Sequence, residues 1–324
     1  MTIYLYLPRY KSRAFFAILL LLAFGCEMQP TATEDSVPTA SLPEEPYLVV
    51  LGIAQDAGYP QAGCTKECCK QPWQDKAQRK MVSCLGLVDP NTQQAWLFDA
   101  TPDFKDQLQQ LETAAPLAGI FLTHAHIGHY TGLIHLGREV MGAQGVPVFA
   151  MPKMADYLTN NGPWGQLVQL NNISLQPMVA DSLIRLNDQL SVRPLQVPHR
   201  DEYSETVGFE IHGPSKSALF IPDIDKWEKW PRDINSLISA HDYAFLDGSF
   251  YENGEIPGRD MSQIPHPFVA ESMQHFSSLS QADKEKIHFI HFNHTNPLLW
   301  KEDTRRTVEA AHYKIAEEKM IVGL

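Results

Sequence analysis

Phe121-Leu-Thr-His-Ala-His-Ile-Gly-His129 is the stretch that decides the fold class and the chemistry of this chain. It overlaps an apolar run at residues 117–122, whose length and composition predict a buried strand. Alternate side chains of an extended segment point to the same side, so His124 and His126 can converge just past the strand end. Neutral imidazole is the commonest protein ligand for transition metals. A chance cluster on a surface loop is the alternative, and three histidines at this spacing make it the weaker one.

Other apolar runs along the chain also end in possible metal ligands. In chain order their terminal side chains are His199, Asp223, Asp247 and His291. Any one of these residues could be an ordinary core or capping residue. Strand ends that all carry His or Asp are, however, what a metal site at one edge of a sheet looks like in sequence. Together with the three histidines of the motif, they indicate a metal centre.

The rest of the pattern predicts a sheet layered with helices in one domain, residues 47–324. Strand-like runs occur at 47–53, 81–89, 95–99, 146–151, 206–211, 218–221, 243–247, 286–292 and 320–322. Helical spacing occurs at 103–111, 131–141 and 304–316. Short alternating pieces at 173–197 predict a further group of antiparallel strands. We expect the run at 320–322 to close a sheet edge.

Residues 1–26 have the order of a bacterial secretory signal. Three basic residues, an apolar run at 14–24 that is too short for a comfortable membrane span, and Gly25 precede Cys26, which resembles a lipobox. We expect cleavage before Cys26, lipidation of that cysteine, and tethering to a bacterial membrane, facing the periplasm or the cell surface. An uncleaved anchor and ordinary secretion are the alternatives. Residues 27–46 are rich in Pro, Thr, Ser and Glu and predict a flexible linker.

Composition restricts the partners. With 44% hydrophobic residues the chain can bury a large core. Cleavage before Cys26 would take the formal net charge from -12 to -15, because three basic residues and no acidic one lie before it. Such an acidic body argues against nucleic acid as a partner. We expect a small-molecule or peptide substrate.

From residue 47 to about residue 300 the chain resembles the metallo-β-lactamase superfamily, and within it the coenzyme PQQ synthesis protein B branch. The histidine motif carries the resemblance to the superfamily. Three further stretches carry the resemblance to the branch: Leu51-Gly-Ile-Ala-Gln-Asp-Ala-Gly-Tyr-Pro60, Asp247-Gly-Ser-Phe250 and His291-Phe-Asn-His-Thr-Asn-Pro297. The resemblance implies an α/β fold, a four-layer αββα sandwich with its metals at one edge of the two sheets.

The resemblance also implies a division of the ligands. By position, His124, His126 and His199 would hold one zinc ion, His129 and His291 a second, and Asp223 would bridge them. A water shared by the metals is the usual nucleophile of such a centre, so we expect Asp223 and His129 to act in catalysis. Iron or manganese are alternative ions.

The motif departs from the family at one position, because Gly128 stands where the family carries Asp. Without that carboxylate the second site would keep two histidines and Asp223. We therefore expect one tight metal, or a tight and a labile one, and a second tight metal in Gly128→Asp. Two tight metals in the unmodified chain would require another carboxylate, with Asp247 or Asp201 as the first candidates.

A cysteine cluster follows the first strand. Relatives of the branch, including cyclic phosphodiesterases of phosphonate breakdown, resemble this chain in having a structural zinc held by a Cys cluster and a late His. Here Cys64, Cys68, Cys69 and His294 would supply the four ligands of a closed tetrahedral site. A disulfide is the alternative, favoured by an oxidising compartment. A metal site uses three of the cysteines together, whereas a disulfide uses two.

The leading functional hypothesis is a membrane-tethered, metal-dependent hydrolase of unknown substrate. Two histidines and one carboxylate are also the facial ligand set of non-heme iron oxygen chemistry, so a metal-dependent oxygenase like the PQQ branch is the second hypothesis. A zinc hydrolase with a single metal would explain Gly128 equally well. The third hypothesis is a non-catalytic metal-binding lipoprotein, and the retention of every other ligand position argues against it.

Overall fold

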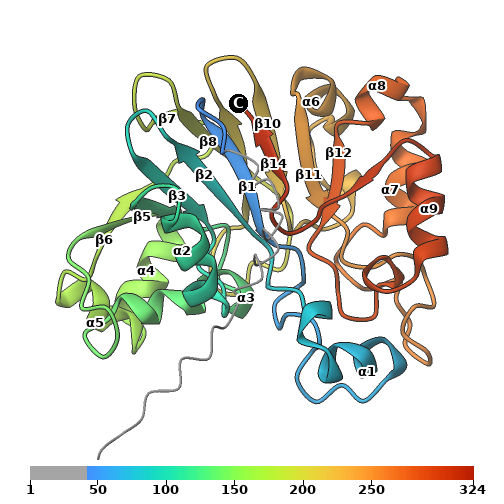
Figure 1. The fold of residues 1–324 in the computed structure, drawn as a ribbon, viewed down its shortest axis with the longest axis horizontal. Coiled ribbons are helices and arrows are strands. Elements are labelled where there is room, and N and C mark those ends of the chain that lie inside the picture. The colour runs from blue at the N-terminus through green and yellow to red at the C-terminus, as the bar shows by residue number, and fades with distance from the viewer. Residues whose placement is uncertain (1–41) are drawn as a thin grey trace, which may run out of the picture. The chain divides into compact units, whose positions relative to one another are not determined.

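The structure is a computed structural model, and it describes residues 42–324. The predicted signal, Cys26 and most of the predicted linker lie outside the described residues. Two seven-stranded sheets dominate the described part of the chain and pack face to face (Figure 1). Within residues 42–324, no helix is long and apolar enough to cross a bilayer.

The first sheet is built from the N-terminal half and closed by the last strand of the chain. Its order is β14 (Ile321–Gly323), β1 (Tyr47–Gly52), β2 (Cys84–Asp89), β3 (Gln94–Phe98), β4 (Leu117–Phe121), β5 (Val146–Ala150) and β6 (Ile173–Pro177). Strands β14 to β3 pair antiparallel and β3 to β6 pair parallel. Helices connect the parallel strands, as such pairs require.

The second sheet comes from the C-terminal half. Its order is β13 (Lys314–Ile315), β12 (Ile287–Ile290), β11 (Tyr243–Asp247), β10 (Ser217–Ile221), β9 (Val207–His212), β8 (Ser191–Gln196) and β7 (Ile184–Arg185). Strands β7 to β10 pair antiparallel, and β10 to β13 pair parallel.

Helices cover the outer faces of both sheets, which gives the four layers (Figure 1). Against the first sheet pack α2 (Phe104–Glu112), α4 (Pro152–Asn160) and α5 (Trp164–Gln169). Against the second pack α6 (Ile234–Ala240), α7 (Val269–His275) and α9 (Glu302–Ala310). The remaining α-helices are α1 (Glu67–Gln74), α3 (Ile127–Tyr130) and α8 (Gln281–Lys284). The predicted α/β fold with an αββα sandwich is confirmed.

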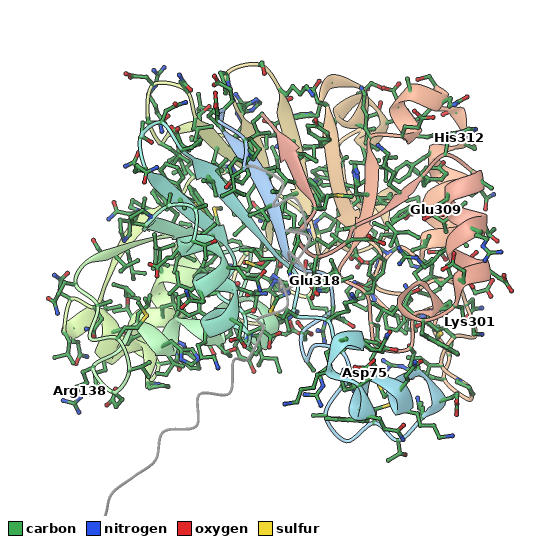
Figure 2. All side chains as sticks on the ribbon, in the orientation of Figure 1. Asp75, Arg138, Lys301, Glu309, His312 and Glu318 are labelled. Atoms are coloured by element: carbon green, nitrogen blue, oxygen red, sulfur yellow. The ribbon has the colours of Figure 1, made fainter. Side chains whose placement is uncertain are left out.

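Period-two alternation along the strands produces the layers. Leu85 and Leu87 of β2 point into the core between the sheets, whereas Val88 points toward the outer helices. Charged side chains such as Arg138 and Glu309 project at the rim (Figure 2).

Two buried phenylalanines fix the strand ends that carry the candidate ligands. Phe98 ends β3 and Phe121 ends β4, and their ring centroids lie 5.2 Å apart. Phe121 also stacks on Phe149 of β5 at 4.3 Å. Full burial of a phenylalanine contributes about 1.5–3 kcal/mol, so these rings hold the adjoining residues Asp99 and His124 in place.

Three sequence predictions of secondary structure are wrong. The helix expected at 304–316 ends at Ala310 as α9, and Lys314–Ile315 form the edge strand β13. Residues 131–141 form a short 3-10 helix, Thr131–Leu136, because the segment packs closely on the turn before α2: a Cβ at Gly132 would lie 2.1 Å from the carbonyl oxygen of Thr101. The first strand of 173–197, β6, pairs parallel with β5 in the first sheet instead of joining an antiparallel group. Alternation shows that a strand is half-buried, but it does not tell which neighbour the strand pairs with.

Candidate metal centre

Four predicted ligands, from the histidine motif and the loops after β8 and β10, converge at one edge of the sandwich. The ligand atoms of His124, His126, His199 and Asp223 all lie within 4.8 Å of one another. Nε2 of His124 lies 2.8 Å from Nδ1 of His126, and Nε2 of His199 lies 3.2 Å from Oδ1 of Asp223. Neither ring nitrogen of His199 has a hydrogen-bond partner, nor has Oδ1 of Asp223, although all three atoms are buried. Buried groups of this kind are costly unless a cation lies among them, so the set fits a metal ion.

A second ligand set lies beside the first. His129 and His291, which the sequence predicts, are joined there by Asp56, which it does not. The Nε2 atoms of the two histidines lie 3.3 Å apart, and each is 3.9 Å from Oδ2 of Asp223. Oδ2 of Asp223 is also 3.4 Å from Nε2 of His124. The Asp223 carboxylate therefore lies between the two histidine sets.

Asp99 orients two histidines of the motif. Its carboxylate accepts hydrogen bonds from the backbone N–H and the hydroxyl of Thr123, at 2.8 and 3.0 Å, and lies 2.7 Å from Nδ1 of His129. The Thr123 hydroxyl in turn lies 3.0 Å from Nδ1 of His124. This network favours protons on both Nδ1 atoms and leaves both Nε2 lone pairs to a metal. Burial lowers the pKa of His124, which keeps it neutral and able to bind a metal.

His291 is held in a strained conformation at the end of β12. Its φ is 68°, in the left-handed region, where a side chain costs roughly 1–2 kcal/mol. Its Nδ1 lies 2.9 Å from the hydroxyl of Ser249, and burial lowers its pKa to about 3. Strain of this kind persists where the surrounding structure enforces it and is frequent at functional sites.

The two carboxylates proposed from the sequence as substitutes for the missing aspartate are engaged elsewhere. Asp247 accepts hydrogen bonds from the backbone of Ile224 and Ser249, and it lies 2.8 Å from Nδ1 of His266. Asp201 accepts a hydrogen bond from Thr206 at 2.9 Å. Neither carboxylate is among the converging ligand atoms.

Sequence reasoning missed three residues of this centre. Asp99 follows a strand, so the strand-end pattern that found Asp223 could have found it. His266 and Asp56 lie in loops, where periodicity gives no signal. His266 is buried, and its Nδ1 lies 3.2 Å from Oδ1 of Asp223. Burial alone would lower the pKa of His266, but the larger opposite effect of Asp247 and Asp223 raises it to about 9.

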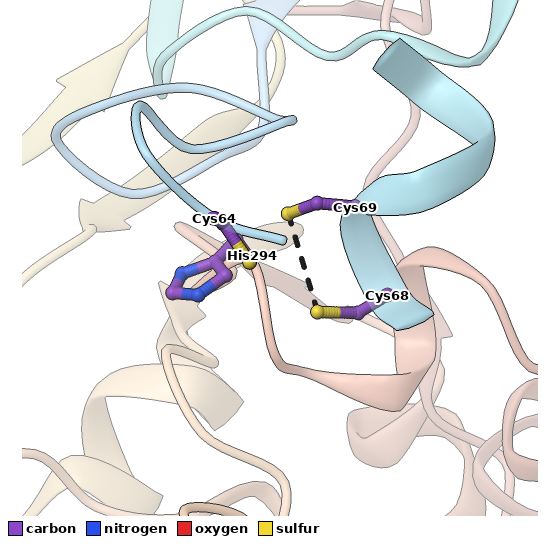
Figure 3. Close-up of side chains that lie close together, drawn as sticks. All are labelled: Cys64, Cys68, Cys69 and His294. Atoms are coloured by element: carbon purple, nitrogen blue, oxygen red, sulfur yellow. Dashed lines mark hydrogen bonds between the residues drawn. The ribbon is translucent and has the colours of Figure 1, made fainter. Parts of the chain in front are cut away.

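The four residues predicted for a structural metal also come together (Figure 3). Cys68 and Cys69 lie at the start of α1, and Cys64 and His294 approach them from two loops. The Sγ atoms of Cys68 and Cys69 are 4.0 Å apart, and none of the cysteines in residues 42–324 forms a disulfide. Burial raises the pKa of Cys69 to about 12, so its thiolate needs a cation beside it. Three thiols and an imidazole suit a closed zinc site.

The loop that carries Asp56 and the cysteines is joined to the segment that carries His291 and His294. The backbone N–H of Gln55 donates to the carbonyl of Phe292 at 2.8 Å, and that of Phe292 donates to Ile53 at 2.8 Å. Asn293 Nδ2 donates to Gln55 Oε1 at 2.6 Å. These bonds place Asp56 beside His291.

A pocket opens next to the second ligand set, with a volume of about 260 Å³. Asp56 and His266 form part of its wall, and the side chains of Arg200 and Arg259 lie at its exposed rim. Two guanidinium groups beside a metal centre favour an anionic ligand.

A further cluster of Glu210, His212 and His241 lies on β9 and after α6. Arg193 donates a hydrogen bond to Glu210 at 2.6 Å. The charge of this carboxylate is already neutralised, and we regard the cluster as part of the packing of the second sheet.

The family relationship agrees with this geometry. Residues 95–292 match the model of the Beta-lactamase superfamily domain. The coenzyme PQQ synthesis protein B of Methylorubrum extorquens strain PA1 is 23% identical over 312 residues, which cover 86% of this chain and all of that protein. The chain belongs to the metallo-β-lactamase superfamily, in its PqqB-like branch. The corresponding protein of Xanthomonas axonopodis pv. citri strain 306 is 25% identical over 78% of this chain and 91% of its own length.

Solved structures of the superfamily share the fold. The zinc-bound PqqB from Methylobacterium extorquens superposes with a TM-score of 0.73 at 21% identity, covering 86% of this chain and all of that one. A diphosphatase from the PhnP family superposes with a TM-score of 0.64 at 21% identity, covering 86% of this chain and 96% of that one. The predicted superfamily and branch are confirmed, and metal binding is supported.

Proposed function

We propose that this PqqB-like protein is a metal-dependent hydrolase, and that its substrate is a small anionic ester or anhydride. The observation that carries the proposal is the position of Asp223, whose carboxylate faces His124 and His199 on one side and His129 and His291 on the other. A carboxylate shared in this way suits a two-metal site.

The residues of the two ligand sets would hold zinc or manganese, which would supply a bound water with a pKa lowered toward neutrality. The residues of the chain supply position and orientation. The Asp223 carboxylate lies within reach of both ligand sets, and Asp99 holds the His129 ring so that its Nε2 points toward Asp223. Asp247 orients His266 at the wall of the pocket, next to the place where a substrate would lie.

The pocket supports an anionic substrate. Arg200 and Arg259 can each pair with an oxyanion, and the volume of about 260 Å³ suits a small molecule better than a folded partner. The similarity to a diphosphatase is consistent with a phosphate ester or anhydride, although that likeness by itself shows only the fold.

The test is a set of phosphodiesters, diphosphates and carboxylic esters offered to the zinc- and manganese-loaded protein. We expect hydrolysis of one phosphate-containing class. Arg259→Ala should raise KM about 10- to 100-fold, the equivalent of one charge-assisted hydrogen bond of roughly 1.5–3 kcal/mol. Arg138→Ala, a change at an exposed arginine on the rim of the molecule, is the matched control and should leave KM unchanged. Failure of every phosphate-containing class, or equal KM values for the two variants, would refute the proposed substrate class.

An oxygenase remains the second candidate, and the observation that favours it is the similarity to PQQ synthesis protein B over 86% of the chain. The two activities separate under argon. Hydrolysis by the zinc-loaded protein should proceed without oxygen, whereas an oxygenase would consume oxygen with the iron-loaded protein and would stop under argon.

We also propose that the mature protein is membrane-tethered through Cys26. The proposal rests on the basic, apolar and Gly-Cys order of residues 9–26. Mass spectrometry of the membrane fraction should find Cys26 lipidated at the mature N-terminus, and an unmodified Cys26 there would overturn it.

A further inference from the structure

A buried oxygen of Asp56 faces the second histidine pair. Oδ1 of Asp56 lies 3.5 Å from Nε2 of His129, too far for a good hydrogen bond. This oxygen is buried and has no hydrogen-bond partner, while the side chain as a whole is 28% exposed. A buried carboxylate oxygen that has no hydrogen-bond partner and faces two imidazoles fits a metal ligand.

The imidazoles opposite Asp56 also have free lone pairs. Nδ1 of His129 is engaged by Asp99, and Nδ1 of His291 by Ser249. Both Nε2 atoms therefore face each other and Asp56 with no proton donor between them. A simple ion pair between Asp56 and His129 does not account for His291, whose Nε2 lies 3.3 Å from Nε2 of His129.

Asp56 occupies the space next to Gly128. A Cβ atom at Gly128 would lie 2.4 Å from Oδ1 and 2.5 Å from Cα of Asp56. The second contact is with the backbone, so a rotamer change of Asp56 could not relieve it. An aspartate at residue 128 and Asp56 in its present position are therefore mutually exclusive, and the expectation that Gly128→Asp simply adds a ligand is wrong.

We propose that Asp56 is the carboxylate ligand of the second metal position, in place of the family's aspartate at residue 128, and that Gly128 is the complementary change that admits it. Asp56 lies outside residues 95–292, the part that matches the family model. The ligand has thus moved from the histidine motif to the loop after β1. The second set becomes two histidines and a carboxylate of its own in addition to the shared Asp223, which predicts two tight metals at the centre. The proposal concerns metal binding and holds whichever reaction the centre performs.

Metal counting tests the proposal without an activity assay. Metal-free full-length protein is titrated with zinc against a competing chelator and, separately, with manganese, whose coupled pairs are seen by electron paramagnetic resonance. Wild type should bind two ions at the centre besides the one at the cysteine cluster, and give the coupled signal. Asp56→Asn, which keeps the size of the side chain, should weaken the second ion by about 10-fold or more and abolish the coupled signal. Asp201→Asn, the same change at a nearby carboxylate that bonds Thr206, should retain both.

Substitution of Gly128 is the second test. A Cβ at residue 128 would lie 2.5 Å from the Cα of Asp56, so Gly128→Ala should push the Asp56 loop away, lower the melting temperature and weaken the second ion. An Asp56→Asn protein that keeps the coupled signal would overturn the proposal. So would a folded Gly128→Ala protein, judged by circular dichroism, that keeps both tight ions.

Discussion

Asp99→Asn should damage the metal centre without touching a ligand. The carboxylate of Asp99 accepts from the Thr123 backbone N–H through Oδ1 and faces Nδ1 of His129 through Oδ2. An asparagine has one acceptor oxygen and one NH2 group in the same places. If the amide nitrogen faces Nδ1 of His129, the proton of that imidazole must move to Nε2. If it faces the Thr123 N–H instead, that buried N–H loses its acceptor.

Both outcomes have measurable sizes. A buried donor without its acceptor costs about 1–3 kcal/mol of unfolding free energy. A His129 with its proton on Nε2 cannot bind a metal through that atom, and loss of an orienting partner typically lowers metal affinity by about 10- to 100-fold. The orientation with the amide nitrogen facing His129 leaves no buried donor unpaired, so we expect Asp99→Asn to adopt it and to lose zinc affinity, measured by titration against a chelator. Denaturant unfolding of the metal-free protein measures any share of the other orientation.

Asp89→Asn is the matched control for this prediction. Asp89 is equally buried, ends β2 at the edge away from the centre, and accepts hydrogen bonds from backbone N–H groups and from Asn187. It should lower the stability and leave the zinc affinity unchanged. If Asp99→Asn behaved in the same way as Asp89→Asn, the orienting role of Asp99 would be refuted.

Two further predictions concern the cysteine cluster and the pH dependence of stability. Cys64→Ser should lose one bound zinc and melt at a lower temperature, because a closed site contributes its binding free energy to folding. Elemental analysis measures the count, and Cys84→Ser is the control that should keep it. An unchanged count in Cys64→Ser would exclude the structural site. Burial lowers the pKa of His288 from 6.5 to about 4, so its contribution is fully present above pH 6.5 and is lost as the pH falls toward 4. Wild type should lose about 2 kcal/mol more unfolding free energy than His288→Gln between pH 7 and pH 5, and equal slopes in urea unfolding would contradict this.

The parts of the fold that could be predicted are those set by local pattern. The strands that end at Phe121, Ile221 and Asp247 are continuous apolar runs, and the residues that follow each run could be read as ligands. His199 and Asp223 were found for this reason, although they lie far apart in the sequence. The pairing of β6 with β5 could not be found, because it depends on the path of the chain through α4 and α5.

The identity of the carboxylate at the second position could not be predicted from pattern either. It depends on the contact between Gly128 and Asp56, which are distant in sequence and brought together only by the hydrogen bonds of Gln55. Asp247 and Asp201 looked like better candidates because they adjoin predicted strands or ligands. Their hydrogen bonds to backbone groups and to Thr206 are invisible in sequence.

The bonded pair of segments beside the centre has a practical consequence for experiments with chelators. Residues 53–69 carry Asp56 and three thiols, and residues 291–294 carry one histidine of each site, with the pairing of Ala54 and Phe292 between them. Removing an ion held by the cysteine cluster would loosen both segments, and with them Asp56 and His291. Inactivation by a chelator would then have two possible origins, loss of metal from the cysteine cluster or from the histidine centre. Inactivation has to be followed ion by ion, and re-addition of metal should restore the centre only after the cysteine cluster has been refilled.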